Sequence, residues 1–183
     1  MYRELPVSEA YHIQTGGPLI MIASVSKDGV PDVMTAAWNA PFDTDQPLVV
    51  LDRGHTTSAN ILATGRYVIC IVSDADTKSA FAAGSCKGRD VGDKFEAKGI
   101  PSRTSPKLGM KVPDGCLAYI ECELQESEKP MFEKYGILVG KAVGVEADEK
   151  YWPEGAGDFR EGMKHEVHHV SGSVLIRGGE ITG

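Results

Sequence analysis

Short runs of apolar and β-branched residues, separated by glycine, proline and aspartate, dominate the hydrophobic pattern of this chain. Leu19 to Ser26 is apolar on both faces at its start, and Val30 to Trp38 follows it after Lys27-Asp28-Gly29. An Asp-Gly step between two such runs is a strong hairpin signal, so we expect the two strands to pair antiparallel. Pro31 stands near the start of the second strand, where its missing N–H costs least.

The pattern after this hairpin predicts two more strands joined by a helix. Leu48 to Asp52 and Tyr67 to Ser73 have the composition of strands, and a short helix signal lies between them. Thr57 can cap that helix, and Gly65 can end it in the left-handed conformation. We expect the helix to cross one end of the sheet.

Further helices and strands follow in the second half of the chain. In the last strand Gly140 and Gly144 mark bends of the kind needed where a sheet curls into a barrel. The strand before it is half-polar on one side, which predicts a solvent-facing or interface position. The expected elements are a helix over Thr77 to Ala83 ended by Gly84, a helix over Asp93 to Lys98, irregular surface over Ile100 to Gly115, and strands over Cys116 to Glu128 and Tyr135 to Glu146.

Length and composition narrow the class of protein. The 183 residues suffice for one domain with a core and are too few for two of ordinary size, so we expect a single domain over residues 1–183. The 21 glycines and 10 prolines, scattered between β-branched runs, favour a mainly β fold with helical excursions. A net charge of −7 without a basic run argues against nucleic-acid binding.

The chain shows no apolar signal core at its N-terminus and no run long enough to span a bilayer, so we expect a soluble, cytoplasmic protein without membrane contact. The four cysteines include no Cys-x-x-Cys pair, which disfavours a zinc knuckle, a redox dithiol and a secreted disulfide framework. Sequence signatures for serine hydrolases, P-loop NTPases and Rossmann dinucleotide binding are also missing.

The tail contains the letters of a zinc protease motif. His165, Glu166 and His169 spell His-Glu-x-x-His, which needs a helix to place both imidazoles on one face. Gly162 precedes the motif, a Ser-Gly step follows it, and the valines around it favour a strand. We therefore expect no metal site in this segment.

The helix signal after Leu48 to Asp52 carries the strongest candidate chemistry. A helix N-terminus points free N–H groups outward, and five neighbouring side chains add a guanidinium, an imidazole and three hydroxyls. Hydrogen-bond donors and positive charges of this kind bind phosphate groups in proteins. The alternative interpretation is an ordinary N-cap on a surface helix. The five side chains are those of Arg53, His55, Thr56, Thr57 and Ser58.

A Gly-rich charged loop, GSCKGRDVGDKF, is a second candidate. Loops of this kind often complete a pocket, and the alternative is a solvated connection. It carries, among others, Ser85, Arg89, Asp90, Asp93, Lys94 and Phe95.

Three stretches together resemble the flavin reductase-like family of FMN-binding split barrels, which includes flavoredoxins. They are LIMIASVSKDGVPDVMTAAWNAP, PLVVLDRGHTTSANILATGRYVICIV and the Gly-rich loop with its DKF. The resemblance covers most of the chain, and the order of the elements matches as well. It implies a six-stranded Greek-key split β-barrel that forms a homodimer, with FMN near the subunit interface.

The resemblance also implies roles for individual residues. His168 would approach the substrate side, although taken alone it is a weak candidate, and Trp38 taken alone is a typical core residue. By analogy the flavin ring would be bordered by Thr35, Ala36, Ala37, Trp38 and Asn39, the phosphate surrounded by Asp52, Arg53, Gly54, His55, Thr57 and Asn60, and the ring covered by the loop Ser85 to Asp90, including Arg89, and by Lys94.

The function implied is that of an FMN-dependent oxidoreductase. The flavin supplies the electron chemistry, so no residue need act as a covalent nucleophile. The electron donor would be NAD(P)H or another redox protein. The alternative is a flavin-binding carrier or sensor without turnover of its own.

Overall fold

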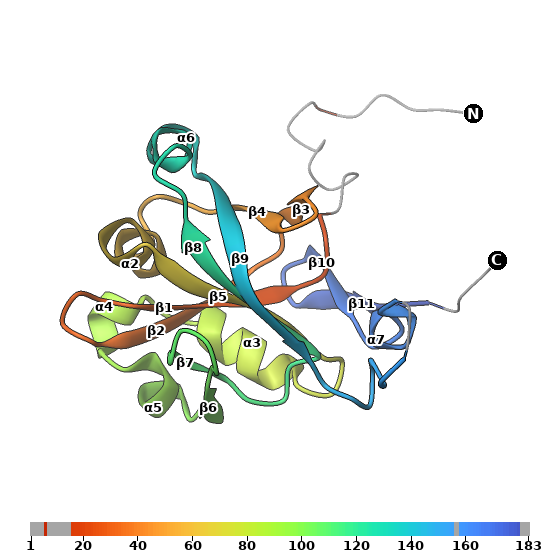
Figure 1. Ribbon diagram of the computed structural model, residues 1–183. Coiled ribbons are helices and arrows are strands. Elements are labelled where there is room, and N and C mark those ends of the chain that lie inside the picture. The colour runs from red at the N-terminus through yellow and green to blue at the C-terminus, as the bar shows by residue number, and fades with distance from the viewer. Residues whose placement is uncertain (1–5, 7–15, 156–157, 180–183) are drawn as a thin grey trace.

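A curled antiparallel sheet is the main element of the computed structural model, which describes residue 6 and residues 16–155 and 158–179 (Figure 1). The sheet has seven strands in the order β2-β1-β5-β8-β9-β4-β3. These strands are β1 (Ile20–Val25), β2 (Pro31–Ala36), β3 (Asn39–Asp43), β4 (Gln46–Val50), β5 (Arg66–Ile71), β8 (Ala118–Leu124) and β9 (Ile137–Ala147). Two separate hairpins pair β6 (Ser102–Thr104) with β7 (Lys111–Pro113), and β10 (Val167–Ser171) with β11 (Val174–Arg177).

Short helices surround the sheet. Figure 1 shows α3 and α5 beneath the β1–β2 hairpin, α4 at the turn of this hairpin, α6 beyond the end of β8, and the β10–β11 hairpin on the side away from α2. The helices are α2 (Thr56–Thr64), α3 (Thr77–Gly84), α4 (Gly88–Val91), α5 (Lys94–Lys98), α6 (Lys129–Tyr135) and α7 (Arg160–Met163).

Strand β1 is buried on both faces, which explains its unbroken apolar run. Met21 packs in one cluster with Phe95 of α5, whereas Ile20 packs in another with Ile61 of α2 and Leu138 of β9. Successive side chains of a strand point to opposite faces, so β1 separates two cores. One core lies under α3 and α5, and the other lies inside the curl of the sheet.

Most of the expected elements are present, and the mainly β class is confirmed. The first two strands pair antiparallel across the Asp-Gly turn, with Gly29 at φ 81°. Pro31 opens β2, an edge strand of the sheet. The helix after β4 ends at Gly65 with φ 70° in the left-handed region, and β5 follows it at once. The sheet has one strand more than the expected six because Asn39–Asp43 forms a short edge strand on β4.

Several local expectations were wrong. Residues 100–115, expected to be irregular, contain the β6–β7 hairpin, and α4, α6 and α7 were not expected. The strand expected over Leu48 to Asp52 is β4, which ends at Val50, so Asp52 lies after the strand, in the segment that leads into α2. Helix α2 has His55 at its N-cap position and no side-chain cap, so Thr57 does not cap it.

Strand β8 was expected to be solvent-facing or to lie at an interface, but its central carboxylate is buried within the chain. Glu121 is 1% exposed and accepts hydrogen bonds from the Ser105 hydroxyl (2.7 Å) and the backbone N–H groups of Lys107 (3.0 Å) and Leu108 (2.6 Å). Three donors compensate the carboxylate for lost water. Glu121 therefore fixes the turn between β6 and β7 against the sheet.

The tail forms strands, as expected. His168 and His169 lie in β10, and Glu166 precedes it. His165 lies 3.3 Å from Asp74, whose carboxylate also pairs with Arg177 at 2.6 Å. Within the residues the structure describes, no cluster of three or more metal-ligating side chains is present, and no helix is long and apolar enough to cross a membrane.

The burial of Glu121 predicts a specific loss of stability on removing its charge. Glu121→Gln would turn one acceptor into an NH₂ that faces a backbone N–H, so the free energy of unfolding should fall by about 1.5–3 kcal/mol in urea denaturation. Glu123→Gln, at an exposed position of the same strand, is the matched control and should change it by less than about 0.5 kcal/mol. Equal effects of the two substitutions would contradict a structural role for Glu121.

Candidate functional site

A pocket of about 320 Å³ opens beside the edge strand β2, between the start of α2, the end of α3 and the start of α4. These three helix ends come from the two sequence regions singled out above. The pocket is lined by Asp32, Met34, Thr35, His55, Thr56, Thr57, Ala83, Gly84, Ser85, Cys86, Lys87, Gly88 and Lys94.

The start of α2 is open to this pocket. His55 occupies the N-cap position in an extended conformation, and its side chain makes no capping hydrogen bond. The first N–H groups of a helix have no intrahelical partner, so those of Thr56 and Thr57 are available to a ligand. Together with the positive end of the helix dipole they favour an anion.

The floor of the pocket is a buried carboxylate on β2. Asp32 is 2% exposed, and its Oδ2 accepts a hydrogen bond of 2.6 Å from the Thr57 hydroxyl. Its Oδ1 forms an ion pair with the Lys94 ammonium at 3.1 Å and has no hydrogen-bond partner among the described residues. Gly88 packs so closely on this oxygen that a Cβ there would overlap it.

Lys94 joins three elements at the edge of β2. Its ammonium donates to the carbonyls of Val33 (2.7 Å) and Ala83 (3.3 Å) in addition to pairing with Asp32. The Val33 carbonyl belongs to an edge strand, and the Ala83 carbonyl lies in the last turn of α3, where a cation is favourable. The ammonium therefore has two backbone hydrogen-bond acceptors and one charged partner.

The polar groups at the mouth of the pocket have fewer protein partners than Asp32 and Lys94. Thr56 Oγ1 accepts a bond of 3.1 Å from the Arg89 backbone N–H, which leaves the hydroxyl hydrogen of Thr56 for a ligand. The Arg89 guanidinium lies 3.3 Å from the Gly54 carbonyl, and Lys87 is an exposed cation on the lining. His55 Nδ1 is buried without a partner among the described residues.

Asp52 lies beside the start of α2. Its carboxylate accepts a 2.7 Å bond from the Gly54 backbone N–H, and this bond, with the nearby His55, lowers the pKa of Asp52. The carboxylate therefore fixes the turn that leads into α2.

The structure brings six of the expected site residues together on the pocket lining. They are Thr35, His55, Thr56, Thr57, Ser85 and Lys94. Asp52, Gly54 and Arg89 border the pocket through the contacts given above. The pocket thus combines both candidate regions, the helix start and the Gly-rich loop.

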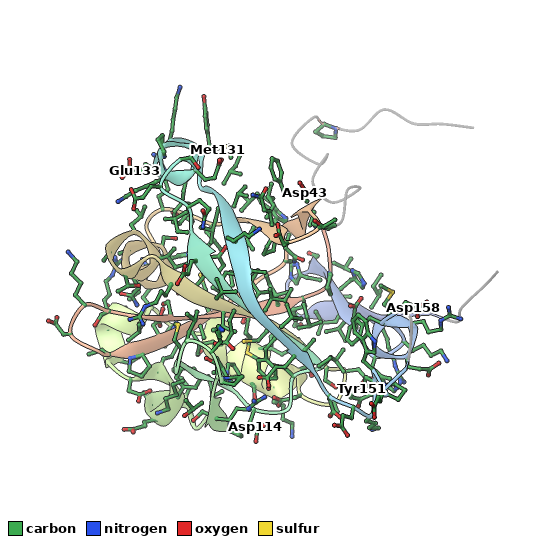
Figure 2. All side chains as sticks on the ribbon, viewed as in Figure 1. Asp43, Asp114, Met131, Glu133, Tyr151 and Asp158 are labelled. Carbon is green, nitrogen blue, oxygen red and sulfur yellow. The ribbon has the colours of Figure 1, made fainter. Side chains whose placement is uncertain are left out.

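Other expected residues point elsewhere. Arg53 donates to the Glu133 carbonyl of α6 (3.1 Å), at the edge of the molecule where Figure 2 labels Glu133. Asn60 is buried and donates to the Ser24 hydroxyl at 3.1 Å. His168 lies on β10, where its Nε2 is 4.0 Å from Glu166. Burial raises the pKa of Glu166.

The remaining expected residues connect the pocket to a second, apolar hollow of about 350 Å³. Ala36 ends β2, Ala37 and Trp38 follow, and Asn39 lines the hollow and donates to the Pro18 carbonyl at 2.8 Å. Trp38 is 53% exposed and is therefore not the core residue that an isolated tryptophan suggests.

Sequence reasoning missed Asp32 as part of the pocket, and it included Cys86, Lys87 and Gly88 only as members of the loop Ser85 to Asp90. Asp32 had a visible signal, because it is the one charged residue in the apolar run Val30 to Trp38. A charge at such a position is rarely buried without a partner. Lys87 and Gly88 lie inside the Gly-rich loop, and nothing in their spacing distinguishes them from its other residues.

Comparison with known proteins gives concordant matches. A family model described as flavin reductase like domain matches residues 14–164. YddH, an uncharacterised protein of Escherichia coli, is 31% identical over 186 residues, covering 98% of this chain and 97% of its own.

Solved structures show the same fold. A crystal structure of an FMN-binding domain of a flavin reductases-like enzyme from Shewanella baltica has a TM-score of 0.80 at 24% identity, covering 98% of this chain and 95% of the other. Flavoredoxin of Desulfovibrio vulgaris has a TM-score of 0.81 at 21% identity, covering 99% and 96%.

The packing of Gly88 on Asp32 predicts that no side chain is tolerated there. Gly88→Ala should displace the carboxylate and lower the free energy of unfolding by about 1–3 kcal/mol, the usual effect of overpacking. Gly84→Ala on the same lining is the control, because its Cβ would lie at an ordinary 3.7 Å from Thr35. Chemical denaturation compares the two, and a Gly88→Ala protein as stable as Gly84→Ala would contradict the packing argument.

Proposed function

The chain belongs to the flavin reductase-like domain family, and on that premise we propose that it is an FMN-dependent oxidoreductase whose residues 1–183 form one flavin-binding domain. The observation that carries the proposal is the uncapped start of α2, which opens into a pocket beside Thr56 and Lys87. Its volume of about 320 Å³ is at the lower end of small-molecule sites. An FMN phosphate matches free N–H groups, a hydroxyl donor and a cation.

The protein's residues would bind and orient the cofactor. The N–H groups at the start of α2, the Thr56 hydroxyl and Lys87 would hold the phosphate. The wall formed by Met34 and Thr35 leads toward the apolar hollow, where an isoalloxazine ring would be shielded from water. When bound, the flavin supplies hydride and electron transfer. We propose NAD(P)H or a partner redox protein as the electron donor.

We also propose that a second copy of the chain covers the apolar hollow. Ile69, Ile71 and Ile120 line it, together with Val145, which is 68% exposed. Phe42 of β3 is 58% exposed. Apolar surface of this extent on a sheet is most commonly buried by two-fold pairing.

The proposal predicts that FMN binds more tightly than riboflavin. Charge-assisted hydrogen bonds to phosphate contribute about 1.5–3 kcal/mol each, so the affinity for FMN should exceed that for riboflavin by at least about tenfold. Fluorescence titration of the purified protein with both ligands measures this ratio. Failure of FMN to bind at high micromolar concentration would refute the proposal.

The same samples separate an oxidoreductase from a carrier. Under anaerobic conditions, NADH, NADPH or a reduced redox protein should bleach the visible bands of bound FMN, and an added acceptor should restore them. A protein that binds FMN but resists every donor would instead be a flavin carrier or sensor.

The apolar hollow predicts a homodimer. Light scattering at low micromolar concentration should give twice the chain mass, and Val145→Lys should shift the protein toward the monomer because it places a charge in the covered face. Val30→Lys, at an exposed valine in the β1–β2 turn, should leave the dimer intact. A wild-type monomer would exclude this assembly.

A further inference from the structure

The pocket contains a charge that no phosphate site needs, the buried carboxylate of Asp32. We infer that Asp32 is a positioning residue that sets how strongly the pocket prefers an anion. It accepts the hydrogen of the Thr57 hydroxyl and neutralises the charge of the Lys94 ammonium. The inference deepens the proposed flavin site and rests on it. It moves the expected phosphate contact from Thr57 to Thr56 and makes Lys87, not the buried Lys94, the lysine that faces the phosphate.

The first step concerns the two neighbouring hydroxyls at the start of α2. A threonine hydroxyl carries one hydrogen, and that of Thr57 is committed to Asp32 at 2.6 Å in a fully buried position. Thr57 therefore presents only lone pairs to a ligand, and lone pairs repel a phosphate. Thr56 accepts from the Arg89 N–H and keeps its own hydrogen, so it can donate.

The second step concerns the two lysines. Lys94 is buried, its ammonium contacts Val33, Ala83 and Asp32, and the paired charges of Lys94 and Asp32 cancel. Lys87 lines the same pocket and is exposed, and no ion pair with a described residue compensates its charge. Of the two lysines, the one available to a phosphate is therefore Lys87.

The third step predicts the direction in which each buried charge changes the preference of the pocket for an anion. Removing the charge of Asp32 leaves the Lys94 ammonium uncompensated at the floor of the pocket, which should increase the preference for an anion. Removing the charge of Lys94 leaves the carboxylate uncompensated and should decrease it. A residue that only supports the fold would lower ligand binding in both cases, without regard to charge.

The test measures the ratio of FMN to riboflavin affinity by fluorescence titration of the full-length protein. Asp32→Asn should raise the ratio by about tenfold, Lys94→Met should lower it by about tenfold, and the double variant should return near the wild-type value. Both single variants lowering the ratio, or neither changing it, would overturn the inference.

A second pair of variants keeps the test decisive if a single charge change prevents folding. Thr56→Val should lower the FMN to riboflavin ratio by about tenfold, whereas Thr57→Val, which leaves the pocket donors in place, should leave the ratio nearly unchanged. The reverse order would show that Thr57 binds the phosphate directly and would overturn the inference.

Inorganic phosphate separates this inference from the proposed function. Its protection against thermal unfolding should follow the same order, with Asp32→Asn above wild type and Lys94→Met below it. If phosphate shows this order but FMN does not bind, the function fails and the inference stands. If FMN binds but Asp32→Asn and Lys94→Met do not change the FMN to riboflavin ratio in opposite directions, only the inference fails. A wild-type protein that binds neither FMN nor phosphate overturns both the function and the inference.

Discussion

A carboxylate buried at the edge of a sheet holds the candidate site together. Asp32 on β2 contacts Thr57 of α2 and Lys94 of α5, and Gly88 of α4 packs against it. Neither charge of the buried pair can be left alone without a large desolvation penalty, so the segments that carry them are tied together. Lys94 also covers the free edge of β2, which would otherwise offer unpaired backbone groups. The pocket exists because these helices are fixed there.

The chain between the two hollows explains how one cofactor would use both. Thr35 lines the polar pocket and Asn39 lines the apolar hollow, with Ala36, Ala37 and Trp38 between them. An amphipathic ligand with an anionic end and a flat apolar ring fits such a path. Under the proposed function, the second subunit closes the apolar end, so that cofactor binding and dimer formation support each other.

The sequence was most informative where the physics is local. The Asp-Gly turn, the positive φ at Gly65 and the strand-forming valines of the tail depend on neighbouring residues, and these predictions were confirmed. Contacts between segments far apart in the chain could not be predicted from the sequence. The Thr57 hydroxyl lies at a helix start, but its hydrogen is taken by a carboxylate 25 positions earlier in the chain. In the sequence, Glu121 has the pattern of a polar position on a solvent-facing or interface strand. In the fold it is buried and accepts hydrogen bonds from backbone N–H groups of the turn between β6 and β7.

A crystal structure of the protein with FMN tests the central claim most directly. The account predicts that the phosphate lies at the start of α2, within hydrogen-bonding distance of the Thr56 hydroxyl and near Lys87, while the contacts of Asp32 with Thr57 and Lys94 persist. A phosphate bound by the Lys94 ammonium or the Thr57 hydroxyl, with the Asp32 contacts broken, would contradict it.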